Sequence, residues 1–265
     1  MSPVEIDEGT SPVILGMPHT GTRLPASALE RLNDRGRVLA DTDWHIDRLY
    51  ADLLPGATTV RATFHRYLID ANRDPSGTSL YPGQNTTGLC PTTDFDGAPI
   101  WHDGAEPGSD EIAARCESYH APYHAALAGQ IARIKQAHGL AILYDCHSIR
   151  AEVPYLFEGV LPDFNIGTND GKSCAAELEA ASVEILSGAT GYTHVVNGRF
   201  KGGWTTRRYG RPQDRVHAFQ MEIAQSTYML EEPPWSYQAA RAEQTRVHLK
   251  ELLARFELLA RTGAL

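Results

Sequence analysis

The stretch LAILYDCHSIR, residues 140–150, joins a run of apolar residues to a run of polar ones. Residues 140–144 predict a buried strand, because a short apolar run that follows a turn signal is typical of one. The turn signal is Gly139, which also stops the helical pattern before it. The polar tetrapeptide DCHS at residues 145–148 then places reactive side chains at the carboxyl end of this strand, and we expect a loop from Ser148 onward.

Strand and helix patterns alternate along the rest of the chain. Further strand-like runs occupy residues 13–17, 58–70, 194–196 and 216–224. Helical patterns occupy residues 27–34, a segment beginning at Asp43, and residues 110–137, 173–187 and 236–261. Such alternation predicts an α/β fold with a mostly parallel sheet covered by helices on both faces. We interpret residues 1–265 as one catalytic domain, with a loop-rich excursion at about residues 74–109.

Composition excludes several classes of function. The net charge of −9 argues against a nucleic-acid-binding protein. No run of apolar residues is long enough for a membrane span, and the acidic first residues do not resemble a secretory signal. The four cysteines are widely spaced and form no CxxC pair. We therefore expect a cytoplasmic protein with reduced thiols.

Two histidines stand at the carboxyl ends of predicted strands. His19 follows the strand at residues 13–17, and His147 follows the strand at residues 140–144. In open α/β sheets, ligands bind beyond the carboxyl ends of the strands. If the two strands are parallel neighbours, both imidazoles point into one crevice. A hydrolytic metal site needs about three protein ligands, and histidines with a carboxylate are a usual combination.

We expect the carboxylate ligand of such a site to come from DTDWHID, residues 41–47, at a predicted junction between loop and helix. Asp43 is the first choice because it can also cap the helix, which would fix its orientation. A capping role alone would account for Asp43 equally well. Asp41, Asp47 or His45 can also replace it as the ligand.

Two more carboxylates have a place in this hypothesis. Asp145 lies two residues before His147 on the same strand face, so it can accept the second ring N–H of a metal-bound histidine. Glu222 lies in VHAFQMEIA, on the face opposite Phe219, Met221 and Ile223. A buried glutamate is costly unless it is paired or functional. An active-site base and an ion pair with an arginine are both open interpretations of Glu222.

Basic residues concentrate in one Gly-rich segment, residues 199–215, which contains a single acidic residue, Asp214. The basic residues are Arg199, Lys201, Arg207, Arg208, Arg211 and Arg215. On a protein with a negative net charge, such a group suits a small anionic ligand better than a polyanion.

A series of stretches together resembles the N-formylglutamate deformylase family. They are MPHTG (17–21), DTDWHIDRLY (41–50), LIDANR (68–73), YPGQNTTGLCP (81–91), YDCHSIR (144–150), NGRFKGGWTTRRYG (197–210) and QMEIAQSTYM (220–229). The resemblance extends over nearly the whole chain. Enzymes of that family hydrolyse N-formyl-L-glutamate to formate and L-glutamate, which is the last step of one bacterial histidine-degradation route.

The resemblance implies both a fold and a site. The fold is a three-layer α/β sandwich around a mixed sheet, phosphorylase/hydrolase-like and similar to the zinc-dependent exopeptidases and amidases. The site is that of a metal-dependent amidohydrolase, with His19, Asp43 and His147 as metal ligands and Glu222 as the base. The metal is expected to be Zn²⁺, although such N and O ligands also suit other divalent first-row ions.

N-Formylglutamate is a small anionic substrate with two carboxylates, and planar bidentate recognition of carboxylate favours arginine. One candidate carboxylate-binding group is Asn72 with Arg73, in LIDANR. Another is Arg199 with Thr205 and Arg207, in the Gly-rich segment.

Other functions compete with this interpretation. A related metal-dependent deacylase of another N-acyl amino acid is compatible with the same motifs. A cysteine hydrolase would use Cys146 or Cys90, but Cys146 and His147 are neighbours on an extended chain and point to opposite faces. A non-enzymatic anion-binding protein would not need His19 and the other site residues together.

A second histidine pair is spaced at i, i+4 on a predicted helix, a spacing that can bind metal. It consists of His120 and His124, with Pro122 between them. Because the pair has no carboxylate partner in the sequence, we interpret both as helix-surface residues.

Overall fold

The computed structural model describes residues 2–79 and 83–265, and in that part of the chain seven strands form one sheet in the order β1-β3-β2-β4-β7-β5-β6. The strands are β1 (Val4–Asp7), β2 (Val13–Met17), β3 (Thr58–Ala62), β4 (Ala141–Ile149), β5 (Phe164–Gly167), β6 (His194–Val196) and β7 (Val216–Ala224). The four central strands β3, β2, β4 and β7 are parallel, β1 pairs antiparallel with β3, and β5 pairs antiparallel with β7 and parallel with β6. The expectation of a mostly parallel sheet is confirmed, and the sheet is mixed.

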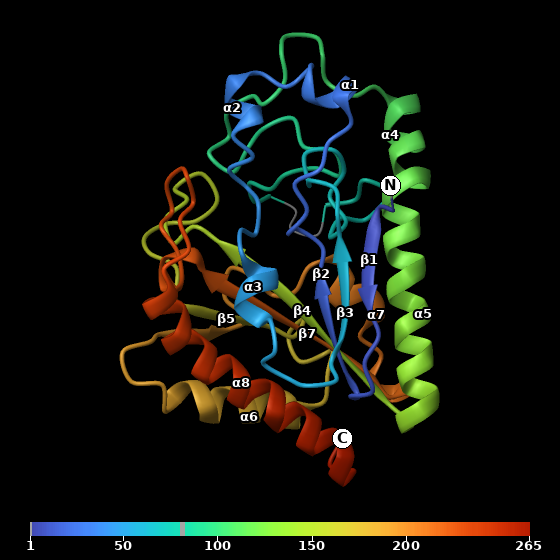
Figure 1. Cartoon of the computed structure of the whole chain (residues 1–265), viewed down its shortest axis with the longest axis vertical. Coiled ribbons are helices and arrows are strands. Elements are labelled where there is room, and N and C mark those ends of the chain that lie inside the picture. The colour runs from blue at the N-terminus through green and yellow to red at the C-terminus, as the bar shows by residue number, and fades with distance from the viewer. Residues whose placement is uncertain (1, 80–82) are drawn as a thin grey trace.

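Helices cover both faces of the sheet and make three layers (Figure 1). The helices are α1 (Ala26–Leu29), α2 (Asp34–Arg37), α3 (Ile46–Tyr50), α4 (Ser109–Arg115), α5 (Ala121–His138), α6 (Ala176–Ser187), α7 (Trp204–Tyr209) and α8 (Ala239–Thr262). Helix α5 packs on one face with α7, and helices α3, α6 and α8 pack on the other. No helix in the described residues is both long and apolar enough to cross a membrane.

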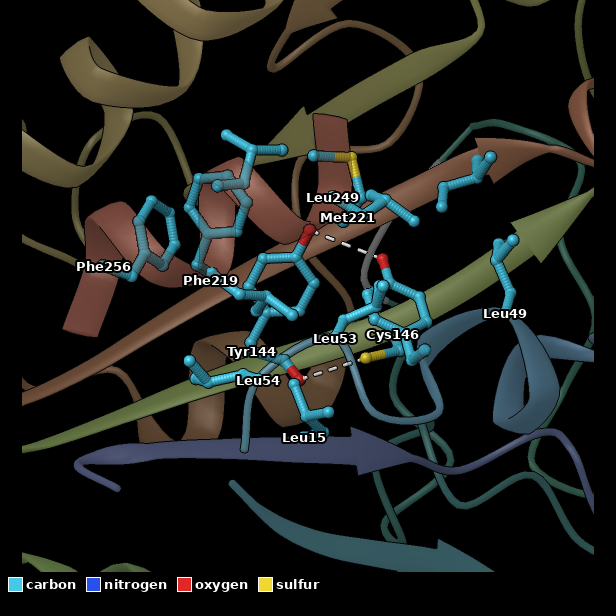
Figure 2. Close-up of a cluster of buried hydrophobic side chains, with 14 of the residues drawn as sticks. Leu15, Leu49, Leu53, Leu54, Tyr144, Cys146, Phe219, Met221, Leu249 and Phe256 are labelled. Carbon is cyan, nitrogen blue, oxygen red and sulfur yellow. Dashed lines mark hydrogen bonds between the residues drawn. The ribbon is translucent and has the colours of Figure 1, made fainter. Parts of the chain in front are cut away.

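Alternation along β4 divides its side chains between the two faces. Leu143 enters the apolar cluster under α5, whereas Tyr144 and Cys146 enter the cluster under α8 (Figure 2). The same alternation in β7 buries Phe219 and Met221 under α8. Odd-numbered residues of β4 therefore face the α5 side. Asp145 and His147 are the buried polar side chains of β4 on this side.

Strand boundaries differ from the sequence expectation in two places. β4 continues through Ile149 instead of giving way to a loop at Ser148, because Asp145 and His147 project from one face and the Ser148 hydroxyl, on the other face, accepts a hydrogen bond from Tyr228. The strand expected at residues 58–70 ends at Ala62. The remainder turns back on itself, with the backbone N–H of Leu68 donating to the carbonyl of His65.

The helix expected at residues 110–137 is not broken at Pro122. It consists of α4, a π-helical turn at Cys116–His120 and α5, which ends at Gly139 in the left-handed conformation. Proline lacks an N–H, so it is tolerated where the wide π turn passes into the first turn of α5.

Smaller differences concern short elements that weak patterns do not reveal. β1, β5 and α7 lie in segments interpreted as loop or left unassigned, and the helix expected at residues 27–34 is instead the two short helices α1 and α2. The loop at residues 74–109 is loop-rich in its described parts. Tyr81 and Pro82, which begin one of the quoted motifs, lie outside the described residues.

Substitution of Phe219 tests the packing of the α8 face. The ring lies between Tyr144 and Phe256, with ring centroids 5.5 and 4.9 Å away. Phe219→Ala should lower the free energy of unfolding by about 3–5 kcal/mol, because it leaves a cavity in a close-packed core. Urea unfolding followed by circular dichroism measures this. Leu258→Ala, at an exposed position of α8, is the control and should change it by less than about 0.5 kcal/mol.

Candidate active site

The site lies where the parallel strands end. β2 is flanked by β3 on one side and β4 on the other, so the chain crosses over at β2, and ligands bind beyond the carboxyl ends of strands at such points. His19 lies two residues after β2, and His147 lies near the end of β4. Glu222 of β7 is the direct neighbour of His147 in the strand pairing. The parallel register thus brings these three side chains to one edge of the sheet.

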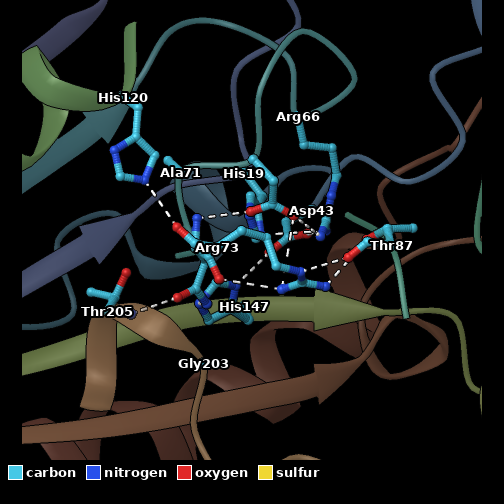
Figure 3. Close-up of polar contacts among 12 residues, drawn as sticks. His19, Asp43, Arg66, Ala71, Arg73, Thr87, His120, His147, Gly203 and Thr205 are labelled. Carbon is cyan, nitrogen blue, oxygen red and sulfur yellow. Dashed lines mark hydrogen bonds and ion pairs between the residues drawn. The ribbon is translucent and has the colours of Figure 1, made fainter. Parts of the chain in front are cut away.

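A buried group of potential metal ligands occupies this edge. It consists of His19, Asp43 and His147, whose ligand atoms all lie within 4.8 Å of one another (Figure 3). Oδ2 of Asp43 is 3.6 Å from Nδ1 of His19 and 3.1 Å from Nδ1 of His147. The three side chains are almost completely buried. Two imidazoles and a carboxylate are a donor set that suits zinc and other first-row ions.

The outer nitrogen of each imidazole has a carboxylate partner. Nε2 of His19 lies 2.7 Å from Asp70, and Nε2 of His147 lies 3.1 Å from Asp145. Nε2 of His147 also lies 3.1 Å from the amide nitrogen of Asn72, so the same ring nitrogen faces both a carboxylate and an amide N–H. Nδ1 of both rings faces Asp43, and a metal ion held there would take the Nδ1 lone pairs while the carboxylates stand at the outer nitrogens. This is the usual arrangement around metal-bound histidines.

The charges of the site favour a bound cation. Burial alone would raise the pKa of Asp43, but His19 and His147 hold that pKa below its ordinary value. Burial would likewise lower the pKa of His147, but Asp145 and Asp43 hold it well above its ordinary value. The carboxylates therefore attract positive charge into the space between the rings. A divalent ion would supply it in place of a ring proton.

The other ligand candidates from DTDWHID point elsewhere. Asp41 is buried and accepts the backbone N–H of Phe95, the ring of His45 contacts the carbonyl of Trp235, and Asp47 pairs with Arg61 on the surface. The expectation that Asp43 caps the following helix is wrong. His45 occupies the cap position of α3, and the Asp43 carboxylate instead accepts the backbone N–H of Ser148.

Glu222 is a buried acid beside the potential metal ligands. Burial raises its pKa to about 8, with His147 lowering it and Asp43 raising it. Its Oε2 accepts a hydrogen bond from Nε2 of Gln220, whose Oε1 accepts the N–H of Gly203. Arg66 acts on Glu222 through its charge, but no hydrogen bond or ion pair joins Glu222 to an arginine of the described chain. Of the two open interpretations, this arrangement favours a base.

Two site residues were missed from the sequence, Arg66 and Asp70. The Asp70 carboxylate contacts His19, accepts the backbone N–H of Asn72 and pairs with Arg66 at 2.6 Å. The Arg66 guanidinium lies 3.8 Å from Asp43 and is buried. Both residues fall in the segment interpreted as strand 58–70. The spacing of Arg66 and Asp70 at i, i+4 could have predicted a helical turn closed by an ion pair.

A cavity opens from this group toward the solvent. Its lining residues are His19, Arg66, Asn72, Arg73, Thr86, Thr87, Phe95, His147, Ser148, Ile149, Leu156, Arg199, Phe200, Gly203, Gln220 and Glu222. Arg73 donates to the carbonyl of Thr87, and Arg199 donates to that of Leu156. Arginine side chains thus stand in the wall of the cavity on segments more than a hundred residues apart.

Two of the predicted substrate-binding residues do not line the cavity. Thr205 is fully buried, and its backbone N–H donates to Oδ1 of Asn72 at 2.8 Å. Arg207 donates to the carbonyl of Gly202. The basic segment as a whole is not one anion site, because Lys201 pairs with Asp170 and Arg215 donates to the carbonyl of Gly139.

The cysteines are placed unfavourably for nucleophilic chemistry. Cys146 lies in the apolar cluster under α8 (Figure 2). Strand alternation puts it on the opposite face of β4 from His147. Burial raises the pKa of Cys146 well above its ordinary value and that of Cys90 to about 11. A thiolate, which is the nucleophilic form, is therefore disfavoured at both positions.

Comparison with known proteins points in one direction. A sequence model of N-formylglutamate amidohydrolase matches residues 11–229. The N-formylglutamate deformylase of Pseudomonas aeruginosa is 48% identical over 247 residues, covering 92% of each chain. That of Pseudomonas putida is 45% identical over 249 residues, covering 93% of this chain and 92% of the other. The crystal structure of N-formylglutamate amidohydrolase from Ralstonia eutropha aligns with a TM-score of 0.81 at 29% identity, over 99% of this chain and 100% of that one.

Metal binding should release a proton at neutral pH. The raised pKa of His147 means that the metal-free ring holds a second proton, and coordination requires that this proton leave. Calorimetric titration of Zn²⁺ into chelator-treated protein, repeated in buffers of different ionisation enthalpy, should report net proton release on binding, from His147 and from Glu222, whose pKa of about 8 a bound cation would lower. The affinity should fall as the pH is lowered. Binding without proton release would contradict this charge balance.

Proposed function

The chain belongs to the N-formylglutamate amidohydrolase family, and on this premise we propose that it hydrolyses N-formyl-L-glutamate to formate and L-glutamate. The observation that supports this most is the buried group of His19, Asp43 and His147 beside Glu222, at the inner end of a cavity with arginines in its wall. We propose that the whole chain acts as one catalytic domain.

A divalent metal, which we propose is Zn²⁺, fits this group. Nδ1 of His19, an oxygen of Asp43 and Nδ1 of His147 would hold it. Three protein ligands leave a position open for water or substrate, as in catalytic zinc sites. When bound, the metal supplies Lewis acidity toward the formyl oxygen and lowers the pKa of a water molecule toward about 7.

Glu222 is the proposed general base and acid. Its carboxylate accepts a proton from the attacking water as the new C–O bond forms at the formyl carbon. The same carboxyl group then donates that proton to the glutamate nitrogen as the C–N bond breaks, which leaves formate and L-glutamate. The hydrogen bond from Gln220 orients the Glu222 carboxylate for both transfers.

Arg66 is the proposed donor to the negative charge that develops on the formyl oxygen. Its guanidinium is held by Asp70 and lines the cavity close to Asp43. A donor that is fixed before the reaction stabilises the oxyanion without the cost of reorientation.

Arg73 and Arg199 are the proposed partners of the two substrate carboxylates, with Asn72 beside Arg73. Guanidinium groups form paired hydrogen bonds with carboxylates, which gives both charge and directional recognition. Thr205 would act indirectly, because its backbone N–H donates to the Asn72 side chain. Arg207 would also act indirectly, through its hydrogen bond to the carbonyl of Gly202.

Formate release tests the proposed substrate directly. The protein, supplied with Zn²⁺, should release formate from N-formyl-L-glutamate and hydrolyse the N-acetyl and N-succinyl analogues much more slowly. Formate is measured with a coupled dehydrogenase and glutamate by chromatography. Faster hydrolysis of a longer acyl group would replace the proposed substrate with another N-acyl amino acid.

The pH dependence of kcat/KM tests the role of Glu222. The base must be ionised, so activity should rise with pH, and a bound cation should place the apparent pKa below the value of about 8 that burial gives the metal-free protein. Glu222→Gln should reduce kcat by about 10²–10⁴-fold and abolish this limb of the profile. Glu251→Gln, at an exposed position of α8, should match the wild type. A Glu222→Gln variant with near-normal kcat would remove this residue from the mechanism.

A further inference from the structure

His120 and His124 are buried, contrary to the sequence interpretation that placed them on a helix surface. Their exposed fractions are 3% and 8%. His120 is the last residue of the π-helical turn, and His124 lies in the first turn of α5. π-Helical turns are rare and often occur near functional sites. Here one buried imidazole is at the end of the turn and the other lies one helical turn further along.

Each imidazole contacts a backbone carbonyl of the segment that carries the proposed substrate-binding residues. Nε2 of His120 donates to the carbonyl of Arg73 at 3.0 Å (Figure 3). Nε2 of His124 donates to the carbonyl of Ala71 at 2.7 Å. Along the chain, one accepted carbonyl lies just before Asn72 and the other just after Arg73. The pair therefore fixes the backbone on both sides of the two residues Asn72 and Arg73.

The electrostatic state of both rings suits this role. Burial lowers the pKa of His120, and burial lowers that of His124 to about 3. Each ring is then neutral and has one N–H to donate. In His124 that proton is on Nε2, which faces the Ala71 carbonyl, and Nδ1 lies 3.0 Å from the Tyr209 hydroxyl, which also contacts the carbonyl of His124. The tautomer and the ring orientation of His124 are thereby fixed together.

Helix α7 completes the support from the other side. The Trp204 ring packs on both imidazoles, with ring centroids 5.3 Å from His120 and 4.5 Å from His124. The preceding residue, Gly203, approaches Asn72 so closely that an added Cβ would lie 2.3 Å from the amide nitrogen. Asn72 is consequently held between α5, α7 and the Asp70 carboxylate, with little freedom to move.

We propose that His120 and His124 are positioning residues for recognition of a substrate carboxylate. They hold the Ala71–Arg73 backbone so that Asn72 and Arg73 face the cavity before substrate arrives, and binding then does not require this segment to be ordered. The inference rests on the proposed function. It adds that preference for a carboxylate over a neutral amide depends on two residues that do not touch the substrate.

The experiment compares substrates that differ in charge at one end. kcat/KM is measured for N-formyl-L-glutamate and for its α-amide and γ-amide, in the metal-loaded full-length protein. His120→Leu and His124→Leu remove the donor, whereas His120→Gln and His124→Gln keep an N–H near the position of Nε2. His138→Leu is the matched control, because His138 also contacts a backbone carbonyl, that of Thr10, from the far end of α5.

The leucine variants should lower the preference for N-formyl-L-glutamate over one of the amides by about 2- to 12-fold, the effect of losing one hydrogen bond. The loss should appear mainly as a higher KM. The glutamine variants should recover most of it, and His138→Leu should retain the wild-type preference. An unchanged preference in both leucine variants, or an equal loss for all three substrates, would overturn the inference.

Two further comparisons keep the outcome decisive. If a leucine variant does not fold, Tyr209→Phe carries the test, since it removes the hydroxyl that orients His124 and should lower the same preference by a smaller factor. An unchanged preference in Tyr209→Phe would then count against the inference. A wild-type protein that releases no formate would overturn the proposed function itself, whereas an active wild type with unaffected variants would overturn this inference alone.

Discussion

The attraction of buried carboxylates for positive charge is the constraint on which the rest of the site depends. Asp43, Asp70 and Asp145 are fully or almost fully buried at the carboxyl edge of the sheet, where isolated charges are expensive. Arg66 offsets part of this charge through Asp70. The remainder falls on His19 and His147, whose inner nitrogens converge on Asp43. A divalent cation between them would satisfy the charge balance and would suit the orientation that the imidazoles already have in the structure.

Asp70 links this charge balance to substrate recognition. One of its oxygens contacts the outer nitrogen of His19 and accepts the backbone N–H of Asn72, while the other pairs with Arg66. The potential metal ligands, the proposed oxyanion donor and the proposed carboxylate-binding segment therefore share one buried group. Displacement of any one of them would therefore disturb the other two.

The sequence was informative where strand periodicity decides geometry and less so where tertiary contacts do. His19 and His147 could be assigned to one edge because alternation and parallel strands fix where such side chains point, whereas Glu222 joined them only through the family resemblance. Arg66 and Asp70 were not predicted as site residues, because the apolar-rich run FHRYLID is also typical of a strand. Its turn depends on tertiary contacts at the site, which the local pattern does not show. The burial of His120 and His124 was not predicted, because a π-helical turn precedes α5. Such a turn rotates the helix that follows, and the local sequence pattern does not reveal it.

The central claim is that the buried histidine–aspartate–histidine group holds a metal ion that hydrolysis requires. The most direct measurement follows metal content by mass spectrometry and formate release from N-formyl-L-glutamate on the same samples, before chelation, after exhaustive chelation and after stepwise return of Zn²⁺. The account predicts that activity disappears with the metal and returns in proportion to it, saturating at about one ion per chain. Full activity in protein shown to be free of metal would contradict it.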